Sequence, residues 1–311
     1  MQIIHGSRKL NGISLPNPVI TLGNFDGVHL GHQKILQKTI RRAQAIGGVS
    51  VVYTFNPHPL NVLRPEQEPL KITTFEEKAR LIEKTGIDFL ICETFTGSFA
   101  RKPPGTFIRD IICKRIHPRE IVIGQDYAFG KNRGGSIELL RTMGEELGFR
   151  VHVINDITIK NIPVRSTTLR KLITDGRVSL AQKLLGTDYS ISGKVVHGKR
   201  RRIGFPTANL SYIKDLVPKN GVYAIRALTP HGLFDGVVSI GYNPTFECEK
   251  LCIEAHLFDF DKDIYGCEIT IRFVKRIRGE KKFKDVESLV KQIKHDIAFS
   301  RRILKKRAEP A

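Results

Sequence analysis

A short segment rich in glycine and histidine constrains the fold of this chain more than any other feature. The segment GNFDGVHLGH covers residues 23–32 and directly follows an apolar run at 18–22. Apolar residues then recur at helical spacing from Ile35 to Ile46, and the β-branched and aromatic run VSVVYTF occupies 49–55. This order of strand, loop, helix and strand is the repeating unit of a parallel sheet.

The same alternation continues through the first half of the chain. Thr74 and Glu77 have the spacing of a capping box, which predicts the start of a helix that ends near Gly86. Further strands are expected at 87–92, 120–124 and 149–154, and further helices at 107–116 and 136–147. The pattern predicts an α/β fold with a doubly wound, Rossmann-like sheet.

The pattern changes after about residue 186. The apolar spacing from Val286 to Ile297 predicts a C-terminal helix, and the 311-residue length suits two domains. We therefore expect a first domain over 1–186 and a second over 187–311. A small antiparallel β-barrel is predicted for the second by short apolar segments at 191–198, 221–228, 234–241, 252–258 and 267–274.

The chemistry expected at the first loop is the binding of a polyphosphate. Gly23, Gly27 and Gly31 let the backbone approach a triphosphate closely, because glycine carries no side chain. The start of the following helix directs unpaired N–H groups and a positive dipole to the same place. His29 and His32 lie three residues apart there and can donate hydrogen bonds to phosphate oxygens. Such donors suit adenylyl transfer, in which charge gathers on the α-phosphate as pyrophosphate departs.

Four segments of the first half resemble the nucleotidyltransferase superfamily, and the loop GNFDGVHLGH in this form resembles bacterial FAD synthetase. The other three are TFNPHP at 54–59, GQDYAFG at 124–130 and STTLR at 166–170. The resemblance implies that His29 and His32 are catalytic. It implies that the flavin is contacted by Phe55, Pro57 and His58. It implies that ATP is bound by Gly23, Phe25, Asp26, Gly27, Gly31, Asp126, Ser166, Thr167 and Arg170.

Several of these residues also have a structural interpretation that the sequence leaves open. Asp26 is either a turn former or a residue that positions the loop, and we favour a structural role. His58 lies between two prolines and either contacts flavin or stays within a rigid turn. Ser166 and Thr167 are either phosphate ligands or helix caps. Arg165 replaces the first serine of the superfamily segment, so the role of that position is open.

The second half contains a turn with oxygen ligands suited to a nucleotide-bound cation. In GFPTANL, residues 204–210, Thr207 and Asn209 project oxygen atoms two residues apart, as a Mg²⁺ ion between phosphates requires. The segment resembles the P-T-A-N motif of riboflavin kinases, and segments at 221, 241 and 253–266 match that family in order. The resemblance implies that Glu254 is the catalytic base that takes the proton from the ribityl hydroxyl.

The resemblance covers nearly the whole chain and implies two transferase activities. The barrel would phosphorylate riboflavin to FMN, and the first domain would adenylylate FMN to FAD and release pyrophosphate. Mg²⁺ is implied at both sites, with ATP, riboflavin and FMN as substrates. Gly198 and Gly204 would bind nucleotide, but the loop between them is shorter than the family pattern and lacks its second glycine. The alternative is therefore that the adenylyltransferase half alone is fully active.

Charge and composition indicate which ligands and which cellular location to expect. The net charge of +20 suits polyanionic ligands, yet no RNA-binding signature is found and aromatic residues make up 8% of the chain. We therefore expect small-molecule substrates rather than nucleic acid. The N-terminal sequence lacks the pattern of a signal peptide, and no run is apolar for long enough to cross a membrane. With five scattered cysteines, we expect reduced thiols and a cytoplasmic location, and the sequence leaves the oligomeric state open.

Overall fold

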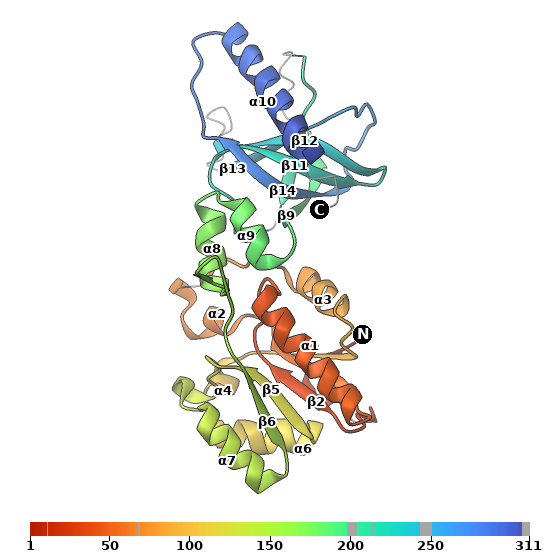
Figure 1. Cartoon of the computed structure of the whole chain (residues 1–311), viewed down its shortest axis with the longest axis vertical. Coiled ribbons are helices and arrows are strands. Elements are labelled where there is room, and N and C mark those ends of the chain that lie inside the picture. Colours follow the sequence, from red (N-terminus) through yellow and green to blue (C-terminus); the bar gives the residue numbers. More distant parts are fainter. Residues whose placement is uncertain (11, 68, 198–203, 213, 243–250, 307–311) are drawn as a thin grey trace. The chain divides into compact units, whose positions relative to one another are not determined.

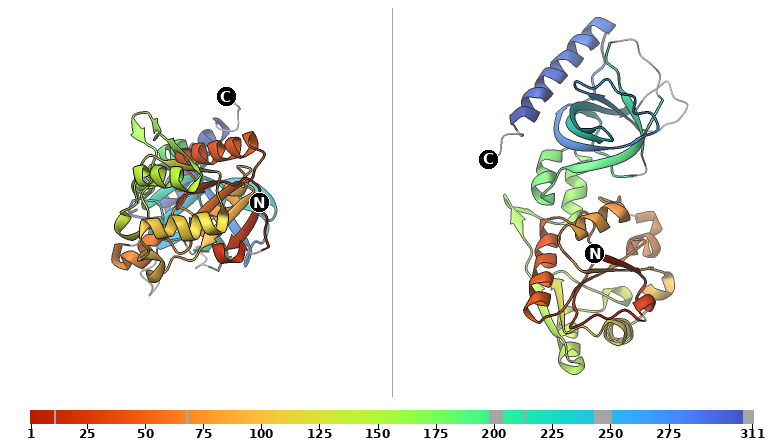
Figure 2. Two further views of the ribbon diagram at one scale, coloured as in Figure 1. Left: turned by 90° about the horizontal axis from the view of Figure 1, so that it is seen from below. Right: turned by 90° about the vertical axis from the view of Figure 1, so that its right-hand side faces the viewer.

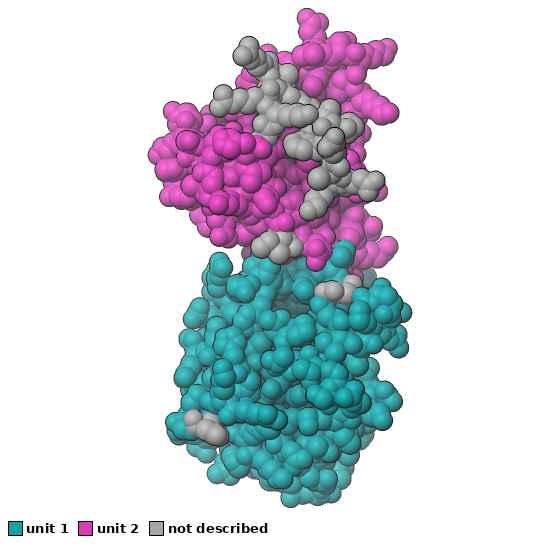
Figure 3. Space-filling view, turned by 180° about the vertical axis from the view of Figure 1, so that it is seen from behind, with its two compact units in different colours: residues 1–166 teal, residues 167–311 magenta. Residues whose placement is uncertain are grey.

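The computed structural model of this chain divides into two compact units (Figure 3). Unit 1 covers residues 1–166 and unit 2 covers residues 167–311. The structure describes residues 1–10, 12–67, 69–197, 204–212, 214–242 and 251–306.

Unit 1 is built on a six-stranded sheet in the order β1-β4-β3-β2-β5-β6, in which every neighbouring pair is parallel (Figure 1). The strands are β1 (Gln2–His5), β2 (Val19–Leu22), β3 (Ser50–Phe55), β4 (Phe89–Glu93), β5 (Glu120–Gly124) and β6 (Arg150–Ile154). All four residues of β2 are buried, as expected for a central strand covered on both faces. A small antiparallel hairpin follows the sheet, formed by β7 (Thr158–Ile159) and β8 (Ile162–Pro163).

Helices cover both faces of this sheet. On one face, α1 and α3 bury Leu36, Ala79 and Ile82 against Val52 and Leu90. The other face is covered by a second group of helices, which includes η3 and α7. The helices are α1 (Leu30–Ala45), α2 (Pro59–Leu63), α3 (Phe75–Glu83), α4 (Gly97–Ala100), α5 (Pro104–Thr106), η3 (Phe107–Cys113), α6 (Lys114–Ile116) and α7 (Ile137–Leu147). Short 3-10 turns complete the unit at η1 (Ser7–Leu10), η2 (Pro65–Gln67) and η4 (Lys131–Arg133).

Two polar contacts fix the helices that flank the first loop. The capping box that the sequence predicts at the start of α3 is confirmed, since the Thr74 side chain and the Glu77 side chain each accept a hydrogen bond from the other's backbone N–H. At the far end of α1, the buried carboxylate of Glu120 accepts hydrogen bonds from Arg42 Nε at 2.7 Å and lies 2.8 Å from His152 Nε2. The hydrogen bond from Arg42 lowers the pKa of Glu120.

Unit 2 contains a closed antiparallel barrel (Figure 2). Its strands follow the order β10-β13-β12-β11-β14-β9. Its strands are β9 (Tyr189–Val196), β10 (Ala208–Tyr212), β11 (Gly221–Thr229), β12 (Gly232–Tyr242), β13 (Leu251–Leu257) and β14 (Glu268–Arg278). Helices α8 (Ser166–Thr174) and α9 (Val178–Leu185) precede it, and α10 (Val286–Lys306) covers one side with Leu304. In the described part of the chain, no helix combines the length and apolarity needed to cross a bilayer.

The predicted fold class is confirmed in both halves. Several elements were not predicted, among them the β7–β8 hairpin and α9, and three further differences concern β1, β10 and η3. Strand β1 was not predicted, because its pairing with β4 joins segments far apart in the chain. Strand β10 was interpreted as a turn, although Ala208–Tyr212 closes the barrel against β9 and β13. The helix expected at 107–116 has π-helical geometry over η3. The sequence predicts a domain boundary after residue 186, whereas the compact units divide after Ser166. The reason is that α9 contacts β9 and β14 of the barrel and so groups with unit 2.

Candidate active sites

The loop between β2 and α1 is held by a buried carboxylate. Asp26 accepts hydrogen bonds from the backbone N–H of Ile72 at 3.1 Å and of Thr73 at 3.0 Å. It also accepts one from the Thr73 hydroxyl at 3.1 Å, and its own carbonyl oxygen accepts from Ser166 Oγ at 3.0 Å. A carboxylate that is 7% exposed and satisfied by this many donors has a positioning role. This supports the structural interpretation of Asp26 rather than direct nucleotide contact.

Backbone conformations that favour glycine shape the same loop. Gly27 has a φ of +83°, and a Cβ there would lie 2.9 Å from Ile72 Cγ2. Its N–H donates to Thr73 Oγ1 at 3.0 Å, so the turn is fixed against the segment before α3. Phe25 and Val28 also have positive φ, at 52° and 40°, and both side chains are buried. The loop is therefore a strained turn that burial and hydrogen bonds hold in place.

The two predicted histidines lie face to face at the start of α1. Their ring centroids are 3.6 Å apart and the planes differ by 15°. His29 is the N-cap of α1, and its Nδ1 accepts a hydrogen bond from the N–H of His32 at 3.2 Å. The proton of a neutral His29 ring therefore resides on Nε2, which makes that atom a donor. A Cβ on Gly31 would lie 3.1 Å from the His29 ring, so Gly31 leaves room for the stacked pair.

His32 is held as a neutral ring with an unused polar atom. Its Nδ1 is buried and has no hydrogen-bond partner among the described residues. Burial lowers the pKa of His32 well below 6.5, and the charges of His29 and Lys78 lower it further. The ring of Phe25 contacts it edge-on, with centroids 5.2 Å apart. Because Nδ1 is enclosed by the protein, a contact between this ring and a phosphate oxygen would be made by Nε2.

The predicted flavin-side residues lie at the end of the neighbouring strand β3. Phe55 ends β3 and packs edge-on against Phe95 and Phe99. The His58 ring caps α2 through Nδ1, and its Nε2 lies 3.3 Å from Asn24 Nδ2 in the first loop. Pro57 follows a cis peptide bond. The loop after β2, assigned to the nucleotide by resemblance, and the loop after β3, assigned to the flavin, therefore meet at the carboxyl edge of the sheet. The flavin contacts themselves remain predictions.

A buried lysine that the sequence analysis did not identify joins these two loops. Lys78 of α3 is 8% exposed, and its ammonium donates to the Asn24 carbonyl at 3.2 Å and to the Thr54 hydroxyl at 3.1 Å. It also reaches the Phe55 carbonyl at 3.4 Å. The sequence contains one signal of its burial. Lys78 lies four residues before Ile82, so both side chains lie on the same buried face of α3.

The other predicted nucleotide ligands in unit 1 lie around the same edge. Gly23 follows β2 and donates its N–H to the Tyr53 carbonyl at 3.1 Å. Asp126 is exposed and follows β5, the strand next to β2. Ser166 contacts the first loop as described above, whereas Thr167 and Arg170 belong to unit 2. The phosphate contacts of these residues remain predictions.

In the barrel, strand pairing places the two central predicted residues side by side. Asn209 of β10 and Glu254 of β13 are direct partners in the antiparallel register. Their neighbours Leu210 and Ile253 are buried in the barrel, so the alternation of strands directs Asn209 and Glu254 to the outer face. Ser239 of β12 is the next partner of Glu254 across the sheet. An amide and a carboxylate thus share one polar surface, which is suited to cation binding and proton abstraction.

The turn before β10 is fixed by a residue that the sequence analysis missed. His256 lies two residues after Glu254 on β13, and its Nδ1 is 2.8 Å from the Pro206 carbonyl oxygen. Thr207 is exposed next to this turn. Gly204 begins the turn with a φ of +82°, while the predicted ligand Gly198 lies outside the described residues. His256 therefore links the threonine-bearing turn to the strand of Glu254.

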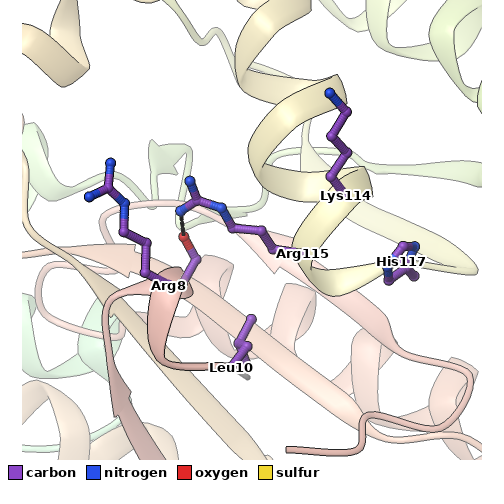
Figure 4. Close-up of a pocket in the computed structure, with 6 residues that line it drawn as sticks. Arg8, Leu10, Lys114, Arg115 and His117 are labelled. Atoms are coloured by element: carbon purple, nitrogen blue, oxygen red, sulfur yellow. Dashed lines mark hydrogen bonds between the residues drawn. The ribbon is translucent and has the colours of Figure 1, made fainter. Parts of the chain in front are cut away.

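A basic pocket of about 510 Å³ in unit 1 involves none of the predicted residues (Figure 4). It is lined by Ser7, Arg8, Leu10, Lys114, Arg115 and His117. Lys114 forms an ion pair with Asp110 at 2.8 Å, and Arg115 donates to the Ser7 hydroxyl at 2.8 Å. The backbone N–H of Ser7 in turn donates to Glu93. Lys114 and Arg115 therefore both have hydrogen-bonding partners within the fold. The pocket is separate from the residues that surround the histidine pair.

Comparison with known proteins finds a matching family for each half of the chain. Residues 13–168 match the sequence model of FAD synthetase, and residues 185–304 match that of riboflavin kinase. The "Bifunctional riboflavin kinase/FMN adenylyltransferase" of Buchnera aphidicola subsp. Schizaphis graminum is 36% identical over 94% of this chain and 95% of its own length. The chain belongs to this bifunctional family.

Other members of the family show the same extent of similarity. The Escherichia coli K12 protein of the same name is 34% identical and covers 95% of this chain and 96% of its own length. The Listeria monocytogenes protein is 37% identical over 90% of both chains.

A crystal structure described as a macrolide-efflux protein from Streptococcus pneumoniae is 31% identical, with a TM-score of 0.87, and covers 97% of this chain and 99% of that one.

The lowered pKa of His32 leads to a direct prediction. In an NMR titration, the His32 ring should take up its proton below pH 6.5, because burial disfavours the charged form. The unfolded chain takes up that proton first, so the stabilising effect of a neutral His32 is lost as pH falls from about 6.5 toward the lower folded pKa. A His32 ring that protonates at or above pH 6.5 would contradict the geometry described.

Proposed function

We infer that this chain is a bifunctional riboflavin kinase/FMN adenylyltransferase. Unit 2 transfers the γ-phosphoryl group of ATP to riboflavin, which gives FMN and ADP. Unit 1 then joins FMN to the AMP part of a second ATP, which gives FAD and pyrophosphate. The observation that supports this most is the stacked pair of His29 and His32 at the N-terminus of α1, in a chain whose barrel also pairs Asn209 with Glu254.

In adenylyl transfer, the protein binds and orients the two substrates. The FMN phosphate oxygen forms a bond to the α-phosphorus of ATP, and the bond from that phosphorus to pyrophosphate breaks. His29 and His32 donate hydrogen bonds to the phosphate oxygens, on which negative charge gathers during this exchange. The start of α1 adds backbone N–H groups, and Ser166 and Asp126 add further proposed nucleotide contacts within unit 1. Nucleotide contacts of Thr167 and Arg170 stay predictions from the family resemblance.

In phosphoryl transfer to riboflavin, Glu254 acts as the general base. It accepts the proton of the terminal ribityl hydroxyl while that oxygen bonds to the γ-phosphorus and ADP leaves. Glu254 is half-buried on the outer face of β13, and the register places it beside Asn209. His256 supports the same surface because it holds the turn that carries Thr207.

We propose Mg²⁺ as the cation of both reactions. Thr207 directly before β10 and Asn209 within β10 offer a hydroxyl and an amide oxygen two residues apart, and Mg²⁺ between nucleotide phosphates usually takes only one or two oxygen ligands from the protein. Among the described residues, no group of three or more histidine, cysteine and acidic side chains could hold a metal ion. The ion would neutralise phosphate charge during transfer.

We propose that both halves are active, with a domain boundary after Gly186. The riboflavin kinase match begins at residue 185, which supports a boundary at that place, although α8 and α9 cluster with the barrel. The alternative of an impaired kinase rests on the loop from Gly198 to Gly204, most of which lies outside the described residues. The described part of the kinase site, with Asn209 beside Glu254, has the groups that the reaction requires.

We propose a cytoplasmic location and small-molecule substrates. Cys92, Cys113, Cys252 and Cys267 are free thiols, as suits a reducing compartment. Anionic ATP and FMN account for part of the net charge of +20. Nucleic acid is not part of the proposed activity, and fractionation of expressing cells tests the location.

The histidine pair should be required for one activity alone. Replacement of His29 or His32 by alanine should lower the rate of FAD formation from FMN by about 100-fold or more, the scale of one lost donor to a developing charge. FMN formation from riboflavin should stay at the wild-type rate. Chromatographic assay of both products, with exposed His295→Ala as the control, measures this. Loss of both activities in a folded variant would contradict separate sites.

Glu254 of the barrel should be required for FMN formation but not for FAD formation. Glu254→Gln keeps the size of the side chain but removes the base, so FMN formation should fall by about 100-fold or more. FAD formation should be unchanged when FMN is supplied. Glu268→Gln, on the exposed side of β14, is the matched control and should leave both rates unchanged. Wild-type FMN formation by Glu254→Gln would rule out Glu254 as the base.

The proposed cation ligand should change the magnesium requirement of the kinase reaction. Asn209→Ala removes one oxygen ligand, so the Mg²⁺ concentration for half-maximal FMN formation should rise by about tenfold. The Mg²⁺ dependence of FAD formation should stay constant. Ser211→Ala, an exposed position of the same strand, controls for effects on β10 itself. An unchanged Mg²⁺ dependence in Asn209→Ala would remove Asn209 from the metal site.

A further inference from the structure

The buried ammonium of Lys78 connects the ends of two strands that approach the proposed adenylylation site. It donates to the carbonyl oxygen of Asn24, which follows β2, and to the hydroxyl of Thr54 near the end of β3. The Thr54 hydroxyl donates to the same Asn24 carbonyl at 3.2 Å. A third contact reaches the Phe55 carbonyl. One side chain therefore fixes the distance between the nucleotide loop and the flavin-side loop.

The contacts of Lys78 are neutral, so its charge is not cancelled at close range. Its acceptors are two carbonyls and a hydroxyl, and none of the ion pairs within 4.0 Å among the described residues includes it. Burial lowers the pKa of Lys78, while the more distant Cys92 of β4 and Asp26 of the first loop raise it. The Asp26 carboxylate is occupied by the N–H groups and hydroxyl of the segment before α3. A buried cation of this kind favours a bound anion nearby.

The charge of Lys78 also acts on the histidine pair. Burial lowers the pKa of His32 most, and the charges of His29 and then Lys78 lower it further. Two imidazole rings stacked 3.6 Å apart repel each other if both are protonated, so a neutral pair keeps the stacked geometry. The titratable and cationic groups that act on His32 are thus His29 from the loop and Lys78 from α3.

We propose that Lys78 is a positioning residue for adenylyl transfer, a role that rests on the proposed function of unit 1. Its ammonium ties the loop of Asn24 to the end of β3, so that the α-phosphate and the FMN phosphate meet at a fixed separation. Burial disfavours the charged form of His32, and the positive charge of Lys78 adds to this effect and favours the triphosphate beside the pair. Lys78 acts through the loops and the rings and does not itself touch the reacting atoms.

The test compares Lys78→Met, Lys78→Arg and the control Lys84→Met, which lies at the exposed end of α3. Lys78→Met should lower kcat for FAD formation by about tenfold to a hundredfold, because a small misplacement of reacting groups has this effect. The acid limb of its pH–rate profile and the NMR titration of His32 should both move to higher pH, since a neighbouring positive charge is removed. Lys78→Arg should keep the His32 titration near wild type and retain more activity.

Riboflavin phosphorylation by the same protein molecules provides an internal control and should be unchanged in every variant. If Lys78→Met does not fold, Lys78→Gln supplies a neutral side chain that keeps a donor for the three acceptors. A wild-type kcat in the neutral variants would overturn the proposal, and so would a lower kcat with an unmoved His32 titration, which indicates a merely structural lysine. A wild-type protein that forms no FAD would instead overturn the proposed function.

Discussion

The carboxylate of Asp26 is the interaction on which the geometry of the first site depends. It accepts hydrogen bonds from the backbone of Ile72 and Thr73, and it thereby holds the turn after β2 against the segment that leads into α3. The positive φ of Gly27 and the close approach of Ile72 are tolerated because of this anchor. The stacked histidines and the N-terminus of α1 take their positions from the same turn. Catalysis of this type depends on donors that are in place before the reaction begins.

The two units use different structural means for related phosphate chemistry. In unit 1, the donors gather where parallel strands end and a helix begins, so the helix start and the loops form the proposed site. In unit 2, the polar groups lie on the outer face of a closed barrel, and the antiparallel register sets their spacing. The first arrangement suits a triphosphate held along its length, and the second suits a cation and a base beside one hydroxyl.

The sequence predicted what depends on local spacing and missed what depends on distant pairing. The alternation of strands and helices, the capping box at Thr74 and the histidines at the start of α1 follow from neighbours in the chain and are confirmed. Strand β1 depends on β4, and the partnership of Asn209 with Glu254 depends on barrel closure, so neither is visible in a local pattern. Lys78 was missed because, in the sequence of a helix with many charged residues, a buried lysine cannot be told from an exposed one. Its contacts come from loops that are distant in sequence.

The central claim is that ATP lies at the junction of β2 and α1, with its α-phosphate beside the two imidazole rings. A crystal structure of the protein with FMN and a non-hydrolysable ATP analogue tests this directly. We expect a ring nitrogen of His29 or His32 within about 3 Å of a phosphate oxygen, the length of a hydrogen bond. A nucleotide bound elsewhere in unit 1, with both rings free of phosphate contacts, would contradict it.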